Sequence, residues 1–477
     1  MHTRGTPLSE RQLCLTAVTW SRHQVVMRFA LDDLGFSTVY WYPEIDLLDL
    51  DRRYGRDFME RVHVHSALFE LLKLASLRPD VLDLGPYSHH HTAGLERLWR
   101  IVFHNAFGQW RYENDLPEVQ APRWASRLAA TQAAPRRLDR HAGEVLFLCG
   151  GGKDSLVSMK LLERGAIPYA SLAYTSSVYG RAQAQLDLID RLLTHGAPRT
   201  RHSLNMLDDF FDAPLLSCCG REAGVRTLAS AETVSGIFAA LPILLSRGYP
   251  HAVVGHEASA NRGNLVWDRT GEEINHQWAK SQEAERLIDD YLRTELCEDT
   301  GFFSILAPLH DVAIFALLRR DLDAVPATHS CNVRKPWCCR CPKCAYVWLG
   351  YRAYLPDETV RAIIPEDLLE VRENHGYFHD MMGLGAHTPF ECIGEIEESR
   401  LALRLCQARG LLGPHGATLA ARLPPLDITR TLDRFLRVDA AGSRIPRALA
   451  GAVLTQMEAA ATQARAWIIA TLSASTV

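Results

Sequence analysis

The sequence predicts an α/β protein built around a parallel sheet, and three observations support this class. The apolar run Val145–Leu148 is typical of a buried strand, three glycines follow it, and Ser155–Arg164 has apolar residues at helical spacing. Beyond these residues, segments of strand and helix character alternate, which favours parallel strands covered by helices. Because such sheets bind ligands at the carboxyl ends of their strands, the glycines mark the expected site.

The N-terminal residues 1–135 are expected to form a mixed α+β domain. Apolar and polar residues alternate in Val25–Phe29 and Phe36–Tyr42, and the turn between these segments predicts a β-hairpin. Two later segments have helical periodicity: Phe58–Leu77 and Ala93–Tyr112. Residues 122–140, rich in Ala, Arg and Pro, are interpreted as a linker.

The sheet domain with the glycines is expected across residues 141–350. Its other elements are expected as strands at Ala166–Ala173 and His251–Gly255 and as helices at Gly180–Thr194 and Ser230–Arg247. Residues 351–477 are expected to be helix-rich and to end in an Ala-rich helix from about Pro446 to Leu472. This region is also expected to contribute residues 387–400 to the site.

Composition limits the classes of protein that fit this chain. With 47% hydrophobic and 23% charged residues over 477 positions, a globular protein of two or three domains is expected. A net charge of −4 gives no general attraction for nucleic acid or an anionic membrane. No apolar run has membrane-spanning length and no signal-peptide core follows Met1, so we expect a cytoplasmic protein. The oligomeric state is not indicated.

Five of the twelve cysteines lie between Cys331 and Cys344, a crowding that favours a metal site over a disulfide framework. The expected ligands are Cys331, Cys338, Cys341 and Cys344, and Cys339 is an extra cysteine inside the cluster. Four thiolates suit tetrahedral Zn²⁺ in a structural role, because they leave no open coordination position. An iron–sulfur cluster or no metal at all are the alternatives.

The glycine loop is expected to bind phosphate, because glycines allow close approach and the free N–H groups at a helix start point at the anion. The loop lacks the Walker A spacing and resembles the pyrophosphate loop, Ser-Gly-Gly-x-Asp-Ser, of the ATP pyrophosphatase superfamily. That resemblance implies an adenine nucleotide α-hydrolase-like domain that binds ATP and Mg²⁺, with Asp154 helping to place the ion. The implied ATP-binding residues are Gly150, Gly151, Gly152, Lys153, Asp154 and Ser155. A tight turn without a ligand is the alternative.

Three polar segments lie where such a sheet would present them to a ligand. They are His256–Asn261, Asn275–Ser281 and His387–Arg400. If the second segment is helical, His276 and Lys280 share one face, and Lys280 could neutralise phosphate charge. Taken singly, each of these side chains also fits a solvated or core position.

An ordered set of segments between Leu146 and Arg400 resembles the UDP-N-acetylmuramoyl-L-alanyl-L-glutamate epimerases. These segments are the glycine loop, Asn261–Asn264, Ile274–Gln277 with Lys280-Ser281, Phe302–Ser304, Ser330–Asn332, Trp337–Cys344, and Pro389–Cys392 with Gly394-Glu395 and Glu397–Arg400. The resemblance implies an isomerase that adenylates the terminal α-carboxylate of a UDP-linked muramoyl dipeptide, inverts L-Glu to D-Glu, and releases AMP and diphosphate. An acid–base pair is then expected among His256, Glu257, His276, His387, Glu391 and Cys392. His276 and Cys392 are favoured, since a protein can tune both groups into the neutral range.

Three other functions remain open on the sequence. The chain could epimerise the C-terminal residue of another peptide that has a free carboxylate. It could pass the adenylate to a nitrogen nucleophile and form an amide or nitrile, which would change the product mass. It could also be a nucleotide-binding or zinc-held interaction module without catalytic activity.

Overall fold

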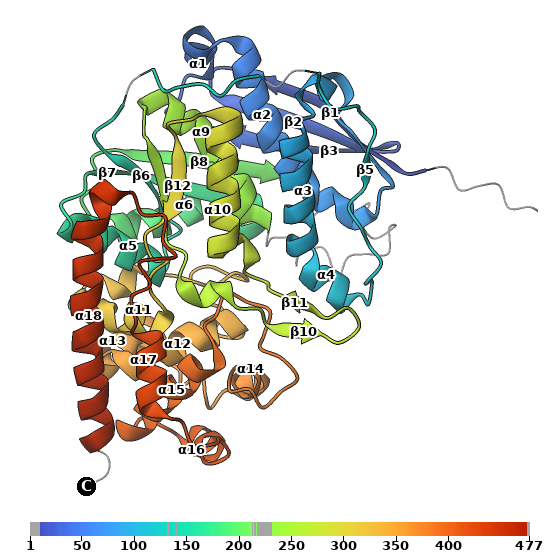
Figure 1. Cartoon of the computed structure of the whole chain (residues 1–477). Helices are drawn as coiled ribbons and strands as arrows, with labels where there is room; N and C mark the ends of the chain where they lie inside the picture. Colours follow the sequence, from blue (N-terminus) through green and yellow to red (C-terminus); the bar gives the residue numbers. More distant parts are fainter. Residues whose placement is uncertain are drawn as a thin grey trace, which may run out of the picture.

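One ten-stranded sheet runs through the protein, in the order β12-β9-β6-β7-β8-β3-β2-β1-β4-β5 (Figure 1). The computed structural model describes residues 10–474 except 131, 132, 140, 212, 214, 215 and 217–230. The strands of this sheet are β1 Gln12–Trp20, β2 Gln24–Leu31, β3 Leu34–Trp41, β4 Val81–Asp83, β5 Arg123–Trp124, β6 Val145–Leu148, β7 Tyr169–Ser176, β8 Arg201–Asp208, β9 His251–Val254 and β12 Gly301–Ser304. The α/β class predicted from the sequence is therefore confirmed.

Five neighbouring strands, β12, β9, β6, β7 and β8, are all parallel. Their carboxyl ends lie at one edge of the sheet, where the glycine loop follows β6 and residue 255 follows β9. The predicted strand Ala166–Ala173 begins later, at Tyr169. The chain still turns before it, because Ala166 has a positive φ of 49° and Pro168 lacks a backbone donor.

The N-terminal strands extend this same sheet. The predicted hairpin is confirmed as β2 and β3, and β3 then pairs antiparallel with β8, from Thr38 opposite Asp208 to Trp41 opposite Asn205. The linker prediction for residues 122–140 needs correction, because β5 adds a short strand at the sheet edge. Arg136 also forms an isolated bridge with Cys297, which attaches this segment to the body.

Helices cover both faces of the sheet. They are α1 Leu47–Tyr54, α2 Arg56–Leu71, α3 Ala93–Ala106, α4 Gly108–Glu113, α5 Lys153–Arg164, α6 Ala182–Leu193, α9 Glu232–Arg247, α10 Gln282–Tyr291, α11 Asp311–Leu317, α12 Pro342–Tyr354, α13 Asp357–Ile363, α14 His375–Met381, α15 Ile396–Ala408, α16 Pro414–Ala421, α17 Ile428–Phe435 and α18 Arg447–Ala474. Two predicted helices are interrupted. Phe58–Leu77 continues beyond α2 as a 3₁₀ turn, and Ala93–Tyr112 breaks at Phe107 into α3 and α4.

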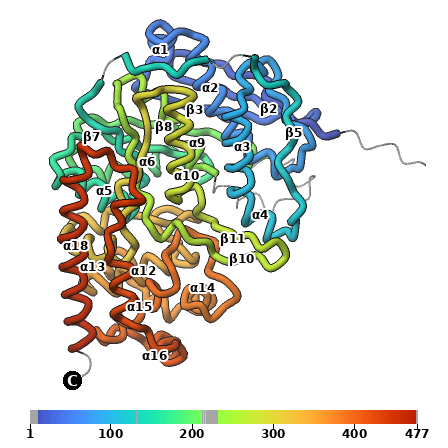
Figure 2. Tube along the Cα trace, in the orientation of Figure 1, coloured from blue at the N-terminus to red at the C-terminus, as the bar shows by residue number. Residues whose placement is uncertain are grey.

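The C-terminal region is helical, as predicted: residues 305–474 contain helices and no strand. The long helix α18 packs beside α5, α11 and α15, so the end of the described chain supports the helix that follows the glycine loop (Figure 2). A small second sheet, β10 Leu265–Trp267 with β11 Glu272–Ile274, lies against α4. Among the described helices, none has both the length and the apolar character needed to cross a bilayer.

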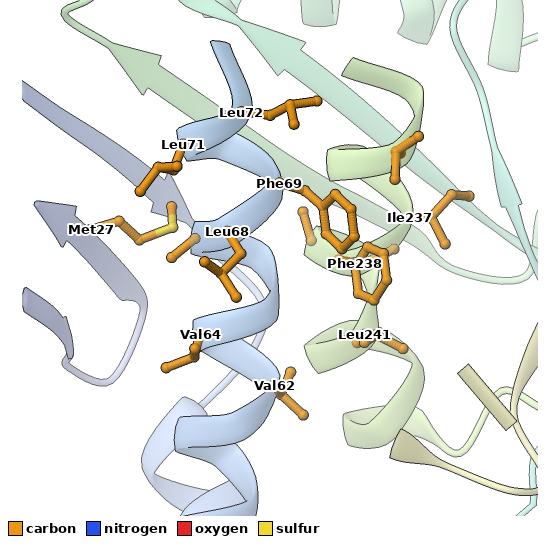
Figure 3. Close-up of a cluster of buried hydrophobic side chains, with 14 of the residues drawn as sticks. Met27, Val62, Val64, Leu68, Phe69, Leu71, Leu72, Ile237, Phe238 and Leu241 are labelled. Carbon is orange, nitrogen blue, oxygen red and sulfur yellow. The ribbon is translucent and has the colours of Figure 1, made fainter. Parts of the chain in front are cut away.

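The sheet separates two hydrophobic cores, and the buried side chains of β6, β7, β9 and β12 alternate between them, whereas those of β1, β2, β3 and β8 all belong to the first core. On β6, Leu146 joins the core under α2 and α9, whereas Val145 and Phe147 join the core under α5 and the C-terminal helices. In the first core the rings of Phe69 and Phe238 stack with centroids 4.5 Å apart (Figure 3). This contact holds α2 of the N-terminal part against α9 of the part that contains the glycine loop.

Replacing Phe238 with Ala should lower the free energy of unfolding by about 3–5 kcal/mol, because the ring is fully buried and its loss leaves a cavity. Urea denaturation followed by circular dichroism measures this loss. Ile469→Ala is the control, since Ile469 is 47% exposed and should cost less than about 1 kcal/mol. Equal losses in the two variants would show that this core contact is not important for stability.

Candidate functional site

The glycine loop has the shape that an anion site requires. Gly151 has a φ of 81°, and a Cβ there would lie 2.4 Å from Nε2 of His329. The backbone N–H of His329 donates to the carbonyl of Gly151 at 2.9 Å. Gly152 is the N-cap of α5, and no side chain caps that helix start. The loop therefore presents backbone donors at the positive end of a helix dipole.

Lys153 points back into the protein and holds the loop from behind. Its ammonium lies 2.5 Å from Asp311 Oδ1 and 2.5 Å from Asp154 Oδ1, and the Lys153 side chain is only 1% exposed. The other carboxylate oxygen of Asp311, Oδ2, accepts a hydrogen bond from the hydroxyl of Tyr346 at 2.7 Å. The ammonium is thus satisfied within the protein, and a direct contact of Lys153 with phosphate stays a prediction.

Two carboxyl groups, Asp154 and Glu257, face the loop region with opposite pKa shifts. Burial raises the pKa of Asp154, but the ammonium groups of Lys153 and Lys343 outweigh it, so the pKa lies below its ordinary value. Burial together with the charges of Asp154 and Asp311 raises the pKa of Glu257 to about 7. Both groups supply the oxygen ligands that Mg²⁺ prefers, and a bound cation would favour the ionised form of Glu257.

Cys392 lies beside three of the predicted acid–base and charge-neutralising residues. Lys280 Nζ is 2.9 Å from Cys392 Sγ, and a ring nitrogen of His276 and a carboxylate oxygen of Glu391 lie within 4.8 Å of the same sulfur. Burial raises the pKa of Cys392, but the ammonium of Lys280, a hydrogen bond with His276 and the ammonium of Lys343 outweigh it, so the pKa is well below the ordinary thiol value. The thiolate is the form that accepts protons.

His276 and Lys280 would share a face only if their segment were helical, and that condition is not met. His276 lies in a turn after β11, and only Trp278–Lys280 form a short 3₁₀ helix. The turn is fixed by Asn264, whose Oδ1 accepts from the backbone N–H of His276 at 2.9 Å. Both side chains nevertheless meet at Cys392, since the turn rather than a helix brings them together.

Two residues of the cysteine-cluster segment contact this same group. Asn332 Nδ2 donates to Glu391 Oε2 at 3.0 Å, and Lys343 Nζ donates to the carbonyl of Cys392. Burial and the neighbouring Cys392 raise the pKa of Glu391. The ammonium groups of Lys280 and Lys343 lower the pKa of both Asp154 and Cys392, so the glycine loop and the group formed by Cys392, His276 and Glu391 share two cationic neighbours.

The other predicted histidines are placed differently. His256 is near Lys280 but enclosed, and burial followed by that ammonium lowers its pKa to about 3. Its backbone N–H donates to Ser304 Oγ at 2.8 Å. His387 packs among aromatic rings, with its centroid 4.8 Å from that of Phe390 and 5.9 Å from that of Tyr112. The structure thus brings His276, and neither of these two, to Cys392.

The four predicted metal ligands come together. The sulfur atoms of Cys331, Cys338, Cys341 and Cys344 all lie within 4.8 Å of one another. Two pairs are 3.9 Å apart, Cys331 with Cys341 and Cys338 with Cys344, and Cys341 also caps the start of α12. This donor set fits tetrahedral Zn²⁺. Cys339 has a positive φ of 59° and does not join the group.

The sequence analysis did not identify four residues of the site: Gln109, Asp311, His329 and Tyr346. Gln109 lies in α4, far from any motif, and its Oε1 is 2.6 Å from His276 Nδ1. Asp311 and Tyr346 lie on helices, and only tertiary packing brings Asp311 to Lys153 and Tyr346 to Asp311. His329 precedes the recognised Ser330–Asn332 segment, which was the one available hint.

Comparison with known proteins gives two family models and several curated relatives. Residues 79–187 and 233–305 match the MurL N-terminal domain, and residues 327–412 match the MurL C-terminal domain. Proteins called UDP-N-acetyl-alpha-D-muramoyl-L-alanyl-L-glutamate epimerase are similar: 31% identity in Micromonospora sp. and 28% in Salinispora tropica. These matches cover 65% of this chain in both cases, and 66% and 65% of the two relatives. The chain therefore matches about two thirds of their length.

Lys280→Met should raise the pKa of Cys392, because the variant removes the ammonium that lies 2.9 Å from the sulfur. Alkylation of Cys392 by iodoacetamide at pH 7 should then slow by about tenfold or more. The rate is measured against pH by mass spectrometry of the Cys392 peptide. Lys160→Met, which disrupts a lysine–glutamate pair elsewhere on α5, should leave the profile unchanged. If the pH profile of Cys392 alkylation is the same in both variants, Lys280 is not the group that stabilises the thiolate.

Proposed function

The chain belongs to the MurL epimerase family, and from this premise we propose that it inverts the terminal glutamate of UDP-N-acetylmuramoyl-L-alanyl-L-glutamate in an ATP-dependent reaction. The observation that carries the proposal is the convergence of Cys392, His276 and Lys280 beside the glycine loop. A phosphate site and a proton-transfer site then lie within reach of one bound substrate. The cytoplasm, where nucleotide-linked precursors and ATP are available, is the proposed location.

Activation by ATP solves the central difficulty of the reaction. A free α-carboxylate resists loss of the neighbouring proton, since the carbanion would lie beside a full negative charge. Attack of a carboxylate oxygen on the α-phosphorus forms an acyl-adenylate and releases diphosphate, which removes that charge. The α-proton becomes more acidic, and after inversion water cleaves the acyl–phosphate bond and releases AMP.

The residues of the glycine loop support the first half of this reaction. The backbone of Gly150–Gly152 and the start of α5 would bind the diphosphate part of ATP, with Ser155 at the helix start. Asp154 and Glu257 would hold Mg²⁺, which neutralises phosphate charge when it is bound. Lys280 is the side chain best placed to add positive charge between the two halves of the site, since Asp154, Glu257 and Cys392 all raise its pKa.

Cys392 and His276 support the second half. One of them takes the α-proton and breaks the Cα–H bond, and the other donates a proton to the opposite face of the planar carbon. Glu391 lies next to both groups, and burial together with Cys392 raises its pKa, which brings this carboxyl closer to the range in which it exchanges protons with them. Neither step requires a pyridoxal cofactor, because the adenylate already withdraws charge from the α-carbon.

A structural Zn²⁺ at the four cysteines would stabilise this arrangement. The cysteine segment contacts three parts of the site: His329 covers Gly151, Asn332 binds Glu391, and Lys343 binds the Cys392 carbonyl. A metal that fixes the segment would therefore fix the glycine loop relative to the proton-transfer residues. Its role is positional, since four cysteines leave no coordination position for a substrate.

The proposed reaction is tested with ATP, Mg²⁺ and the muramoyl dipeptide in deuterated water. The wild type should form AMP, place one deuteron on the glutamate α-carbon and yield D-glutamate after hydrolysis. His276→Ala should lose α-deuteration by about a hundredfold or more while it still binds ATP, because only proton transfer is removed. AMP without deuterium would indicate a ligase, and neither signal would show that this dipeptide is not the substrate.

Loss of one cluster ligand should release the metal. Cys338→Ser is expected to lose most bound zinc, measured per chain by inductively coupled plasma mass spectrometry, and to bind ATP at least several-fold more weakly by calorimetry. Cys339→Ser is the matched control, because the adjacent cysteine is outside the cluster and should retain the metal. If the wild type contains iron and absorbs visible light, the four cysteines hold an iron–sulfur cluster and not zinc. A wild type without bound metal would contradict the proposed metal site.

A further inference from the structure

His276 is held by a residue from the N-terminal part of the chain. Gln109 on α4 is 5% exposed, and its Oε1 lies 2.6 Å from His276 Nδ1. The other end of the same amide is also engaged, since Gln109 Nε2 donates to Glu113 Oε1 at 2.8 Å, one turn further along α4. A chain of contacts therefore runs from Glu113 through Gln109 and His276 to Cys392.

The chemistry of this chain of contacts fixes the proton on the imidazole. An ionised carboxylate only accepts hydrogen bonds, so the amide atom that faces Glu113 must be the NH₂ group. The oxygen of Gln109 therefore faces His276, and Nδ1 must carry the hydrogen that it accepts. Neutral imidazole has one N–H, so Nε2 is left with a free lone pair and is the ring nitrogen available to Cys392.

We propose that Gln109, oriented by Glu113, is a positioning residue that holds His276 with Nδ1 protonated and with Nε2 free to accept the proton of Cys392. Transfer of the thiol proton to Nε2 gives a thiolate and an imidazolium, with no change in total charge. This is the arrangement in which a nucleophile or base pairs with histidine and a third group orients the ring. Its effect on epimerisation rests on the proposed function, whereas the state of the thiol does not.

The charged and titratable groups around this pair come from several elements. Those facing His276 or Cys392 are Lys280, Lys343, Glu391 and Tyr179. The side chain of Gln109 hydrogen-bonds Glu113 and His276 and none of these four groups, so we expect them to stay in place when Gln109 is changed. A change in the titration of Cys392 in such a variant therefore reports the imidazole, and not the lysines.

The test uses Gln109→Met, which keeps the length of the side chain and removes the acceptor. The pH profile of Cys392 alkylation should move up by about one unit, and kcat for the epimerase should fall about tenfold or more with little change in the KM for ATP. Gln109→Glu retains an acceptor for Nδ1–H and should restore the low-pH reactivity. Gln183→Met on α6 is the matched control, because Gln183 also donates to a carboxylate four residues later, Asp187, at 2.7 Å.

A second variant keeps the proposal testable if Gln109→Met does not fold. Glu113→Gln, at an exposed position, lets the amide of Gln109 turn over and should also move the profile upward. A profile unchanged in a folded Gln109→Met or Glu113→Gln protein would overturn the proposal. The alkylation assay needs no substrate, so a wild type without epimerase activity would overturn the proposed function and leave this result valid.

Discussion

The site depends on one buried ion pair, between Lys153 and Asp311. Both side chains are 1% exposed, so neither charge has water as an alternative partner. Removing one partner of such a pair typically costs about 3–5 kcal/mol, since the other is left buried and uncompensated. The pair ties the glycine loop to α11, and Tyr346 extends the tie to α12. Because α12 also carries Cys344 and Lys343, the loop, the cysteine cluster and the carbonyl of Cys392 are joined through a few polar contacts.

The remaining charges explain why one small region can serve two chemical tasks. Lys280 is close to Asp154, Glu257 and Cys392, and these anions raise its pKa. The same ammonium lowers the pKa of Cys392, so the group that would face phosphate also maintains the thiolate. The pKa of Glu257 moves in the opposite direction from that of Cys392. It rises to about 7, because burial and two neighbouring carboxylates disfavour the charged form of Glu257. A bound divalent cation would reverse that balance, which links the loop to the ligand it is proposed to hold.

The sequence was most informative where chemistry is local. The glycine loop, the parallel strands and the spacing of the four cysteines depend on neighbouring residues, and the elements they predict are present. Contacts that depend on packing could not be predicted from the sequence. Gln109 contacts His276, which is 167 positions away, and Asp311 contacts Lys153, which is 158 positions away. The sequence left open whether the segment around His276 is helical, and the structure shows a turn there that Asn264 holds. β8 was missed, and with it the pairing that makes the two parts of the chain share a sheet.

That shared sheet has a consequence for how the chain is made. β3 pairs with β8 through residues such as Thr38 and Asp208, which lie 170 positions apart. During translation, the N-terminal strands leave the ribosome long before their partner does. Until β8 arrives, one side of β3 is an open edge whose backbone groups can pair with another nascent chain. Because this pairing is so distant in sequence, the topology favours late completion of the sheet.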